Sequence, residues 1–424
     1  MLDIRMIRER SEEVQQAAVR KRLAFKVEEL MAIDDRRREL LTLTENLRAE
    51  RNRRTEQIKR LLGENRKEEA DQERVIAQAM LGKLKETELA LRDAEAAYNR
   101  CMLLVPNFMS PDTPVGASDE DNVEMRRIGQ PPYFAFEPRN HVELGTKLDM
   151  IDMERGVKVG GSRQYVLKNN GLRLHRAVQQ LALDLLEEKG YTLLDVPVMV
   201  KEETLVASGF FPLNRDQTYA IQGEDKWLVG TAEVPLVSYY GGELLDLTSP
   251  IRLGAASPCY RSEIGSAGRD VHGLYRVHQF AKVEQVVICQ ADLQLAGQLL
   301  EQMTANAEEL LQLLELPYRV VAVCSGDMSQ KNYKQYDLET WMPSRNNYGE
   351  THSASLLLDF QARRSRIRYR DQEGELKFAY TLNNTMVATP RILIPIIENH
   401  QQEDGSIYVP AALRPYLKGQ EQLR

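Results

Sequence analysis

A glycine-rich stretch in the second half of the chain combines charged and aromatic side chains in a spacing suited to nucleotide binding. It reads YRSEIGSAGRDVHGLYRVHQF, with Arg261 and Glu263 before a polar loop and Arg276 and Phe280 on the return. A hairpin would place these four side chains around one cavity. Arginine guanidinium groups bind phosphate oxygens bidentately, and an aromatic ring can stack on a flat base. The stretch therefore predicts a pocket for ATP that lacks a P-loop, and we expect the polar loop Gly265–Asp270 to close over the substrate.

Two further segments place polar side chains where a core would need apolar ones. Glu284 lies in the apolar, strand-like segment KVEQVVI, and a carboxylate there needs a partner or a ligand. The segment TLNNTMVATPR carries Asn383, Thr385 and Arg391 where a strand passes into a helix. An arginine near the start of a helix is unfavourable for the helix dipole, which indicates an anion nearby. Both segments are therefore candidates for a binding site.

The segment GTAEVPL allows two interpretations. Thr231 and Glu233 follow Gly230 at a predicted helix N-terminus. In that position they can act as an N-cap residue and its capping-box partner. They can equally contribute polar groups to the pocket, and the local sequence does not separate the two.

The composition excludes several classes of protein. The chain has 424 residues, 42% of them hydrophobic, and this length predicts more than one domain. The four cysteines show no C-x-x-C spacing, which argues against a disulfide framework or a zinc site and predicts a reducing cytoplasm. The charged start MLDIRMIRER and the lack of a long apolar run predict neither a signal peptide nor a membrane span. Because the net charge is -7, any contact with RNA must come from a local basic surface.

Residues 27–98 lack proline and repeat apolar side chains at heptad-like intervals. A break at Gly63–Asn65 predicts two helices of about 35 residues that form an antiparallel coiled coil. A solvated coiled-coil face would explain the many charges on these helices, and a basic tip that contacts RNA would explain them as well. The candidate RNA contacts near the predicted tip are Arg48, Arg51, Arg54, Lys59 and Arg60.

The remainder of the chain predicts a linker and one larger domain. The proline-rich, acidic segment 103–135 separates a helical arm at 1–102 from a domain at 136–424. Amphipathic helical patterns in that domain alternate with strand-like segments that hairpins can connect. Thr192–Val200 is predicted as an edge or interface strand, because Pro197 cannot donate a hydrogen bond to a neighbouring strand. This mixture predicts an α+β domain built on an antiparallel sheet.

Taken together, these motifs resemble a known family. RSE…RVHQF resembles motif 2 of the class II aminoacyl-tRNA synthetases. The segments GTAEVPL, RSEIGSAGRD, HQFAKVE, ETHSAS, DFQARR and TLNNTMVATPRIL are similar, in order and spacing, to segments of seryl-tRNA synthetases of the bacterial type. The resemblance covers essentially the whole chain, including the coiled-coil arm and the linker segment NFMSPDTPVG.

The resemblance implies a fold, an activity and partners. The fold would be a class II synthetase antiparallel sheet of about six or seven strands, flanked by helices and preceded by the helical arm. The region around Gly190 and Pro197 resembles motif 1, which forms the interface of a homodimer in this class. The resemblance implies a cytoplasmic enzyme that activates L-serine with ATP and Mg²⁺ and transfers it to tRNA(Ser), bound across the dimer. Serylation of tRNA(Sec), common in the family, is implied as well.

The resemblance also implies roles for individual residues. Arg261 would bind the ATP α-phosphate and the serine carboxylate, and Arg276 would bind the γ-phosphate. Arg391 resembles the motif 3 arginine on the other side of the nucleotide, and Glu263, which would contact the adenine, completes the implied catalytic set. Phe280 would stack on the adenine. The other implied residues are Ser262, Val277, Glu350, Thr351, His352 and Ser353 for ATP, with Glu350 and Ser353 binding the metal, and Thr231, Ala232, Glu233, Glu284, Asn383 and Thr385 for serine.

The chain departs from the common family pattern at three places, one of which, residues 160–165, reads GGSRQY where SGSRFY is usual. Motif 3 reads NNTMVATPR where many bacterial members have a glycine-rich version, and His272 stands where an arginine is frequent. Two other functions are therefore considered: a paralogue that activates serine for a carrier or small molecule, and a non-catalytic coiled-coil binding protein. Such paralogues usually lose the arm, and a decayed site would lose residues such as Arg261 or Glu284. This chain keeps both the arm and these site residues.

Overall fold

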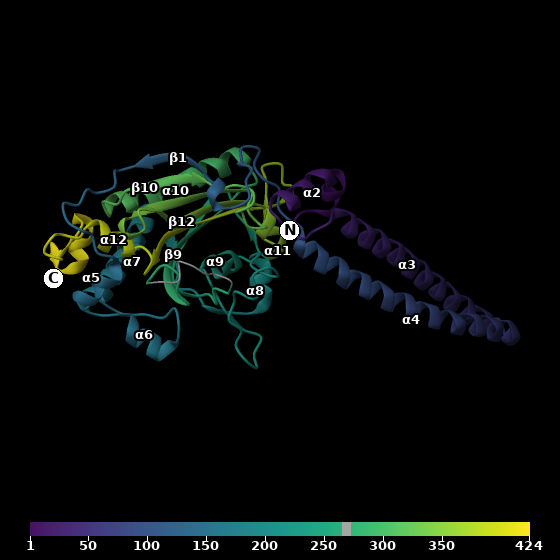
Figure 1. Cartoon of the computed structure of the whole chain (residues 1–424). Helices are drawn as coiled ribbons and strands as arrows, with labels where there is room; N and C mark the ends of the chain where they lie inside the picture. Colours follow the sequence, from purple (N-terminus) through teal and green to yellow (C-terminus); the bar gives the residue numbers. More distant parts are fainter. Residues whose placement is uncertain (265–272) are drawn as a thin grey trace. The chain divides into compact units, whose positions relative to one another are not determined.

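A computed structural model of the chain describes residues 1–264 and 273–424 (Figure 1). These residues form two compact units. The helical unit comprises residues 2–19 and 23–106, and the sheet unit comprises Met1, Arg20–Arg22 and Asn107–Arg424. Within the two described ranges, no helix is both long enough and apolar enough to cross a lipid bilayer.

Two long antiparallel helices dominate the helical unit (Figure 1). Leucines at heptad-like intervals are buried along the pair, among them Leu30 and Leu40 on the first helix and Leu84 and Leu91 on the second. The first helix ends at Gly63, where the sequence predicted the break, so the antiparallel helical arm is confirmed. The helices of this part of the chain are α1 (Ile4–Glu9), α2 (Ser11–Arg20), α3 (Val27–Gly63) and α4 (Lys67–Leu104).

A buried carboxylate, Asp34, connects three helices of this unit. Its side chain is only 2% exposed. Asp34 Oδ2 accepts a hydrogen bond from Arg8 Nη2 of α1 at 2.6 Å, and Asp34 Oδ1 accepts one from Arg37 Nη2 at 2.7 Å. The Arg37 guanidinium carbon also lies 4.5 Å from the centroid of the Tyr98 ring on α4. The cluster therefore ties α1, α3 and α4 together.

We expect Asp34→Ala to destabilise the helical unit by about 2–4 kcal/mol, because two guanidinium groups lose the acceptor that they share. Thermal unfolding followed by circular dichroism would measure the loss. Asp35→Ala is the matched control, since Asp35 also contacts Arg8 but is 57% exposed, and surface pairs contribute only about 0–1 kcal/mol. Equal shifts in Tm for the two variants would contradict the structural role of Asp34.

A large sheet forms the centre of the sheet unit. It has eight strands, and neighbouring strands pair antiparallel except for the last pair, which is parallel. In spatial order the strands are β1 (Val123–Ile128), β10 (Tyr318–Ala322), β11 (Lys334–Met342), β12 (Asn347–Leu358), β15 (Tyr380–Thr389), β9 (Gln279–Cys289), β8 (Ile251–Tyr260) and β4 (Thr192–Leu193).

The two faces of this sheet differ in chemistry. The long helices α7 (Asn169–Glu188) and α10 (Leu293–Leu313) cover one face and form the main apolar core with it (Figure 1). Since side chains alternate along a strand, Val283 of β9 joins this core while its neighbours Lys282 and Glu284 lie on the other side, where they line a cavity. The fold thus gives one face to packing and part of the other to polar groups.

The structure corrects three details of the predicted sheet. The segment 103–135, predicted as a linker, contributes the edge strand β1, whose charged residues Glu124, Arg126 and Arg127 suit an exposed sheet edge. The predicted strand Thr192–Val200 is instead two short strands, β4 and β5 (Met199–Val200), because Pro197 between them cannot donate a ladder hydrogen bond. The predicted strand that enters motif 3 continues to Thr389, so Asn383 and Thr385 lie within β15, while Arg391 lies just before the helix α12 (Leu393–Asn399), as predicted.

Short elements complete the sheet unit and connect the strands. They include α9 (Glu233–Tyr239), which packs with neighbouring residues on the polar side of the sheet, next to the apolar parts of β8 and β9. The others are η1 (Asp119–Asp121), α5 (His141–Lys147), β2 (Ile151–Asp152), α6 (Met153–Gly160), β3 (Val166–Leu167), α8 (Glu202–Ala207), β6 (Trp227–Leu228), β7 (Leu244–Leu245), η3 (Pro343–Arg345), α11 (Phe360–Ser365), β13 (Arg368–Arg370), β14 (Leu376–Phe378), α12 (Leu393–Asn399), β16 (Ile407–Tyr408), η4 (Ala411–Leu417) and β17 (Gln422–Leu423).

Candidate active site

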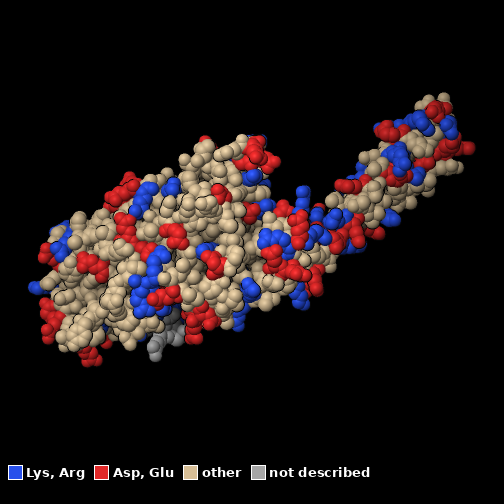
Figure 2. Space-filling view, turned by 90° about the horizontal axis from the view of Figure 1, so that it is seen from above, with Lys and Arg blue, Asp and Glu red and all other residues tan. Residues whose placement is uncertain are grey.

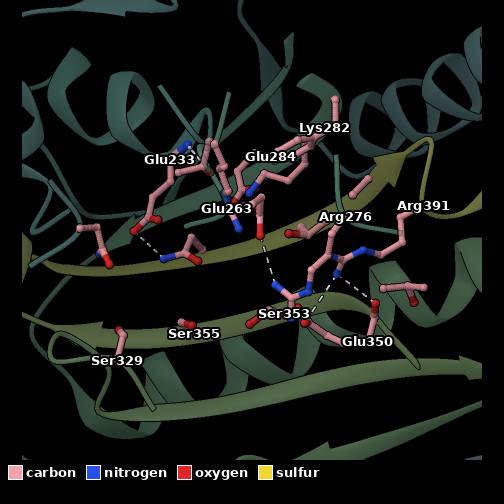
Figure 3. Close-up of a pocket in the computed structure, with 18 of the residues that line it drawn as sticks. Glu233, Glu263, Arg276, Lys282, Glu284, Ser329, Glu350, Ser353, Ser355 and Arg391 are labelled. Atoms are coloured by element: carbon pink, nitrogen blue, oxygen red, sulfur yellow. Dashed lines mark hydrogen bonds and ion pairs between the residues drawn. The ribbon is translucent and has the colours of Figure 1, made fainter. Parts of the chain in front are cut away.

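A cavity of about 300 Å³ lies on the polar side of the sheet. Figure 3 shows side chains that project into it from several segments, among them Glu284 and Arg276, with Glu350 beside Arg391. Most residues predicted to bind ATP or serine line this cavity, although they come from segments far apart in sequence. These residues are Thr231, Glu233, Arg261, Glu263, Arg276, Val277, Phe280, Glu284, Glu350, Thr351, Ser353, Asn383, Thr385 and Arg391.

Three of the predicted residues have side chains outside the cavity lining. The Ser262 hydroxyl donates a hydrogen bond to Asp216 O at 2.7 Å, and Ala232 packs in an apolar cluster next to α9. His352 is fully buried, and its Nδ1 lies 2.9 Å from the Thr351 hydroxyl oxygen. Burial lowers the pKa of His352 to about 3, so its ring stays neutral at physiological pH. The structure therefore gives these three side chains no direct part in the cavity.

The loop expected to close over the substrate, Gly265–Asp270, lies outside the described residues, as does His272. The residues on either side of that segment are described. Glu263, just before it, has a left-handed backbone with φ of 50°, a conformation that costs a non-glycine residue about 1–3 kcal/mol. Its carboxylate Oε2 accepts a hydrogen bond from Arg276 Nη1 at 3.3 Å (Figure 3). Residues on either side of the segment are thus joined by an ion pair within the cavity.

Strand alternation explains how β9 serves the site. Phe280, Lys282 and Glu284 are separated by two residues each, and all three line the cavity. Because side chains of a strand alternate between the faces of the sheet, this spacing places an aromatic ring, an ammonium group and a carboxylate in one row.

A β-bulge explains how β12 supplies Glu350 and Ser353. Residues three apart in a regular strand face opposite sides of a sheet. Here Leu338 pairs with His352 while Glu339 pairs with Glu350, so Thr351 is an extra residue that shifts the register. The shift brings the Glu350 carboxylate and the Ser353 hydroxyl to the same face, where both line the cavity.

The arginines of the site are held by specific acceptors and rings. Arg261 Nε donates to Gly230 O at 3.3 Å, and its guanidinium carbon lies 5.4 Å from the centroid of the Phe280 ring. Arg391 Nε donates to Tyr275 O at 3.1 Å and its Nη1 donates to Glu350 O at 3.1 Å. Arg391 also lies over the Tyr275 ring, at 4.3 Å from its centroid. Each guanidinium group is therefore oriented before any ligand binds.

One end of the cavity holds two buried ion pairs. Glu284 is 1% exposed, and its Oε2 lies 2.5 Å from Lys282 Nζ. Burial raises the pKa of the Glu284 carboxyl, and the negative charge of Glu233 raises it further, while Lys282 opposes the shift. Glu233 Oε1 accepts hydrogen bonds from Asn383 Nδ2 at 2.9 Å and from Lys331 Nζ. These groups form a small polar pocket that suits a zwitterion with a hydroxyl group.

Both interpretations of Thr231 are consistent with its position. Its hydroxyl oxygen accepts a hydrogen bond from Glu233 N at 3.1 Å, as a residue before a helix often does. The Glu233 side chain does not return this contact, because it is bonded to Asn383 and Gln361 instead. Thr231 therefore caps the helix locally, and it also lines the cavity.

The sequence analysis missed several residues of the cavity. Lys282 could have been found, because it falls between Phe280 and Glu284 in the same alternating row. Tyr275 directly precedes Arg276 but gave no signal of its own. Lys331 lies in a loop with no periodic pattern, and only the fold shows that it reaches Glu233. The remaining missed polar residues are Asn214, Asp327, Ser329, Asn332, Gln335, Ser355 and Thr389.

The buried residue His141 supports the return of the loop that leads to Arg276. Its Nε2 accepts a hydrogen bond from Leu274 N at 3.2 Å, so the ring proton lies on Nδ1. Nδ1 in turn donates to Glu398 Oε1 at 2.7 Å, and Glu398 Oε2 accepts from Ser344 N at 2.9 Å. Although burial alone would raise the pKa of the Glu398 carboxyl, the bonds from His141 and Ser344 hold it below its usual value.

The basic residues predicted to contact RNA are engaged within the arm itself. Figure 2 shows basic and acidic side chains interspersed along the arm on the face in view. Arg54 is 25% exposed and bridges the two long helices through Glu73, which indicates a structural contribution. Of the other four, Arg48, Lys59 and Arg60 are exposed and Arg51 is half-buried, and each has a polar partner. Their partners are Glu88 for Arg48, Asn52 for Arg51, Glu56 for Lys59 and Glu64 for Arg60.

Family models match both parts of the chain. Residues 1–109 match the seryl-tRNA synthetase N-terminal domain. Residues 218–400, which include all the predicted residues that line the cavity, match the tRNA synthetase class II core domain (G, H, P, S and T).

Relatives and solved structures agree over the full length. A serine–tRNA ligase of Deinococcus radiodurans is 45% identical over 427 aligned residues, which cover 100% of this chain and 99% of the relative. The crystal structure of seryl-tRNA synthetase from Pyrococcus horikoshii complexed with ATP is 35% identical, with a TM-score of 0.90 and coverage of 100% and 99%. The cytoplasmic serine–tRNA ligase of Naegleria fowleri in complex with AMP is 27% identical, with a TM-score of 0.85 and the same coverage. On the strength of this full-length identity, the chain belongs to the seryl-tRNA synthetase family of class II aminoacyl-tRNA synthetases.

Proposed function

We propose that this chain activates L-serine with ATP to form seryl-adenylate and transfers the seryl group to the 3′ end of tRNA(Ser). The observation that carries the proposal is the juxtaposition of two different subsites in one cavity. Arg261 and Phe280 form a surface suited to a nucleotide, and the buried carboxylates Glu233 and Glu284 form a pocket suited to a small amino acid. A relative of similar sequence has been crystallised with ATP, which supports the assignment of the nucleotide.

The proposed roles follow the chemistry of each side chain. Arg261 binds the α-phosphate and the serine carboxylate, and Phe280 stacks on the adenine. Arg276 binds the γ-phosphate, Arg391 lies on the opposite side of the nucleotide, and Glu263 accepts a hydrogen bond from the adenine. Guanidinium groups suit these roles because they offer planar donor pairs to phosphate and carboxylate oxygens.

Glu350 and Ser353 are the proposed ligands for Mg²⁺. A carboxylate and a hydroxyl are oxygen donors of the kind that Mg²⁺ prefers, and the bulge at Thr351 turns both toward the cavity. Gln335 Nε2 donates to Ser353 Oγ at 3.1 Å and thereby orients the hydroxyl. A bound Mg²⁺ would neutralise phosphate charge, as metal ions do in phosphoryl transfer.

The proposed reaction has two steps. A serine carboxylate oxygen attacks the α-phosphorus of ATP, and the bond from that phosphorus to the bridging oxygen breaks to release pyrophosphate. A terminal ribose hydroxyl of the tRNA then attacks the seryl carbonyl carbon, forming an ester, and AMP leaves. In the first step the protein aligns the reactants and stabilises negative charge, with Arg261 closest to the charge that moves.

The proposed partners are tRNA(Ser) and a second copy of the chain. In this proposal the helical arm contacts the tRNA bound to the other subunit of a homodimer, using exposed basic residues such as Arg48 and Arg60. Surface ion pairs contribute about 0–1 kcal/mol, so the arm's internal pairs can be exchanged for phosphate contacts. Serylation of tRNA(Sec) and a cytoplasmic location belong to the same proposal.

One assay series tests this function against its alternatives. Serine-dependent ATP–pyrophosphate exchange measures the first step, and charging of tRNA(Ser) measures the second. A paralogue that serves a carrier or a small molecule would show exchange without charging. A non-catalytic coiled-coil binding protein would show neither activity. Exchange and charging together support the proposal.

We expect Glu284→Gln to raise the KM for serine by about tenfold or more, because a buried site built to pair with a polar substrate discriminates strongly when one partner is lost. The KM for ATP should change by less than about threefold, since Glu284 lies in the amino acid pocket rather than beside Phe280 and Arg276. Steady-state pyrophosphate exchange with each substrate varied in turn measures both values. Equal losses for serine and ATP would remove Glu284 from the proposed serine pocket.

A further inference from the structure

A lysine remote in sequence from the cavity is buried without a carboxylate partner among the described residues. Lys21 is 3% exposed. Its Nζ donates hydrogen bonds to Gln330 O at 3.1 Å and to Asn332 O at 2.6 Å. Burial lowers the pKa of Lys21 to about 7. An ammonium group buried on backbone carbonyls alone is costly, so its position needs an explanation beyond packing.

A second buried residue holds the same short loop. Asn107 is fully buried, and its Nδ2 donates to Lys331 O at 2.9 Å and to Leu357 O at 2.8 Å. Its backbone N–H donates to Gln330 O at 2.9 Å. Lys21 and Asn107 together therefore bind the carbonyl oxygens of three consecutive residues, 330, 331 and 332. Both belong to the sheet unit, and residues 23–106 lie between them in sequence.

The loop held in this way carries side chains of the cavity. Lys331 Nζ forms an ion pair with Glu233 Oε1, the same oxygen that accepts from Asn383 Nδ2. Asn332 Nδ2 donates to Ser355 Oγ at 3.2 Å, and Ser355 also lines the cavity. A backbone fixed on both sides of Lys331 fixes where its ammonium group lies. Displacement of that group would leave the Glu233 charge without its cation beside Glu284.

We propose that Lys21 and Asn107 are positioning residues that fix loop 329–332 and hold the Lys331 ammonium on Glu233, thereby setting the affinity of the cavity for its amino acid. This inference rests on the proposed function, because it takes the ligand next to Glu233 to be serine. Lys331 is the residue through which the two others act. Neither Lys21 nor Asn107 lines the cavity.

The test compares Lys21→Met with Lys331→Met in serine-dependent pyrophosphate exchange. We expect each variant to raise the KM for serine about tenfold while the KM for ATP stays within about twofold. Lys334→Met is the matched control, since Lys334 lies close by in sequence but pairs with Asp112 and does not line the cavity. It should leave both KM values unchanged.

The double variant separates positioning from general damage to the fold. If Lys21 acts through Lys331, the combined Lys21→Met and Lys331→Met variant should have the serine KM of the single variants, because the second change removes nothing further. The inference would be overturned if the double variant raised the serine KM by the product of the two single increases. It would also be overturned if Lys21→Met raised the KM for serine and the KM for ATP equally. If Lys21→Met does not fold by circular dichroism, Asn107→Ala takes its place with the same expected results.

Failure of this inference is distinct from failure of the proposed function. If the unchanged protein shows no serine-dependent exchange, the proposed function fails, and the ligand that binds next to Lys331 and Glu233 is no longer assigned. If the unchanged protein is active and Lys21→Met behaves like Lys334→Met, only the positioning role of Lys21 is lost.

Discussion

Arg261→Lys is expected to slow serine-dependent pyrophosphate exchange by roughly tenfold or more, because lysine keeps the charge but loses the planar fork of donors. The Arg261 guanidinium is oriented from two sides, by Gly230 O and by the Phe280 ring. We place it at the α-phosphate, where negative charge moves in the transition state. The kcat should therefore fall more than the KM for ATP rises, and steady-state exchange at varied ATP concentration measures both.

Arg252→Lys is the matched control for this prediction. Arg252 lies on β8, the strand that leads to Arg261, but its Nη1 donates to Pro250 O at 3.5 Å, and it does not line the cavity. Its replacement should leave the exchange rate unchanged. If the Arg261 variant matched this control, Arg261 would have no role at the α-phosphate.

Elements governed by a regular period could be predicted from the sequence. The coiled-coil arm follows from its heptad-like leucines and from the break predicted at Gly63–Asn65, where α3 ends. The presence of Glu284 in an apolar strand correctly indicated a buried carboxylate with a partner, and that partner is Lys282. In both cases the local sequence pattern and the tertiary structure require the same environment for the residue: burial for the leucines and a buried polar partner for Glu284.

Features that depend on irregular backbone could not be predicted in this way. Glu350 and Ser353 are three residues apart, and only the bulge at Thr351 turns them to one face of the sheet. The strand β1 was assigned to a linker, because this short, charged edge strand does not keep the apolar residues at every second position that indicate a strand in a sequence. His352 was grouped with its neighbours by motif alone, although the structure buries its ring away from the cavity.

Contacts between distant segments were equally hidden. Lys21 stands in a charged helical stretch and Asn107 in a proline-rich one, and neither pattern indicates a buried residue. Their common target, the loop around Lys331, is more than 200 residues away from Asn107 in sequence. Only the fold shows that two such residues hold three consecutive carbonyl groups.

Replacement of residues 49–87 by a short glycine turn is expected to abolish charging of tRNA(Ser), with a loss of about a hundredfold or more, while pyrophosphate exchange stays within about twofold. The cut falls where Arg48 of α3 pairs with Glu88 of α4 at 2.8 Å, so the two helices are adjacent there and a short turn can join them. The cluster around Asp34, with Arg37 and Tyr98, stays in place to stabilise the shortened arm. Exchange and charging assays on the same preparation separate the two activities.

Salt dependence shows whether the arm acts through phosphate contacts. Each phosphate contact contributes a release of counterions, so charging by the full-length protein should weaken steeply as the salt concentration rises. Arg60→Gln removes one exposed charge, whose pair with Glu64 is long at 3.7 Å. It should reduce the slope of the logarithm of the binding constant against the logarithm of the salt concentration by about one, the contribution of one phosphate contact. Lys26→Gln, at the exposed start of α3, is the matched control and should leave the slope unchanged. If the shortened protein charged tRNA(Ser) normally, the arm would be a structural element only, and recognition of the tRNA would have to come from the sheet unit.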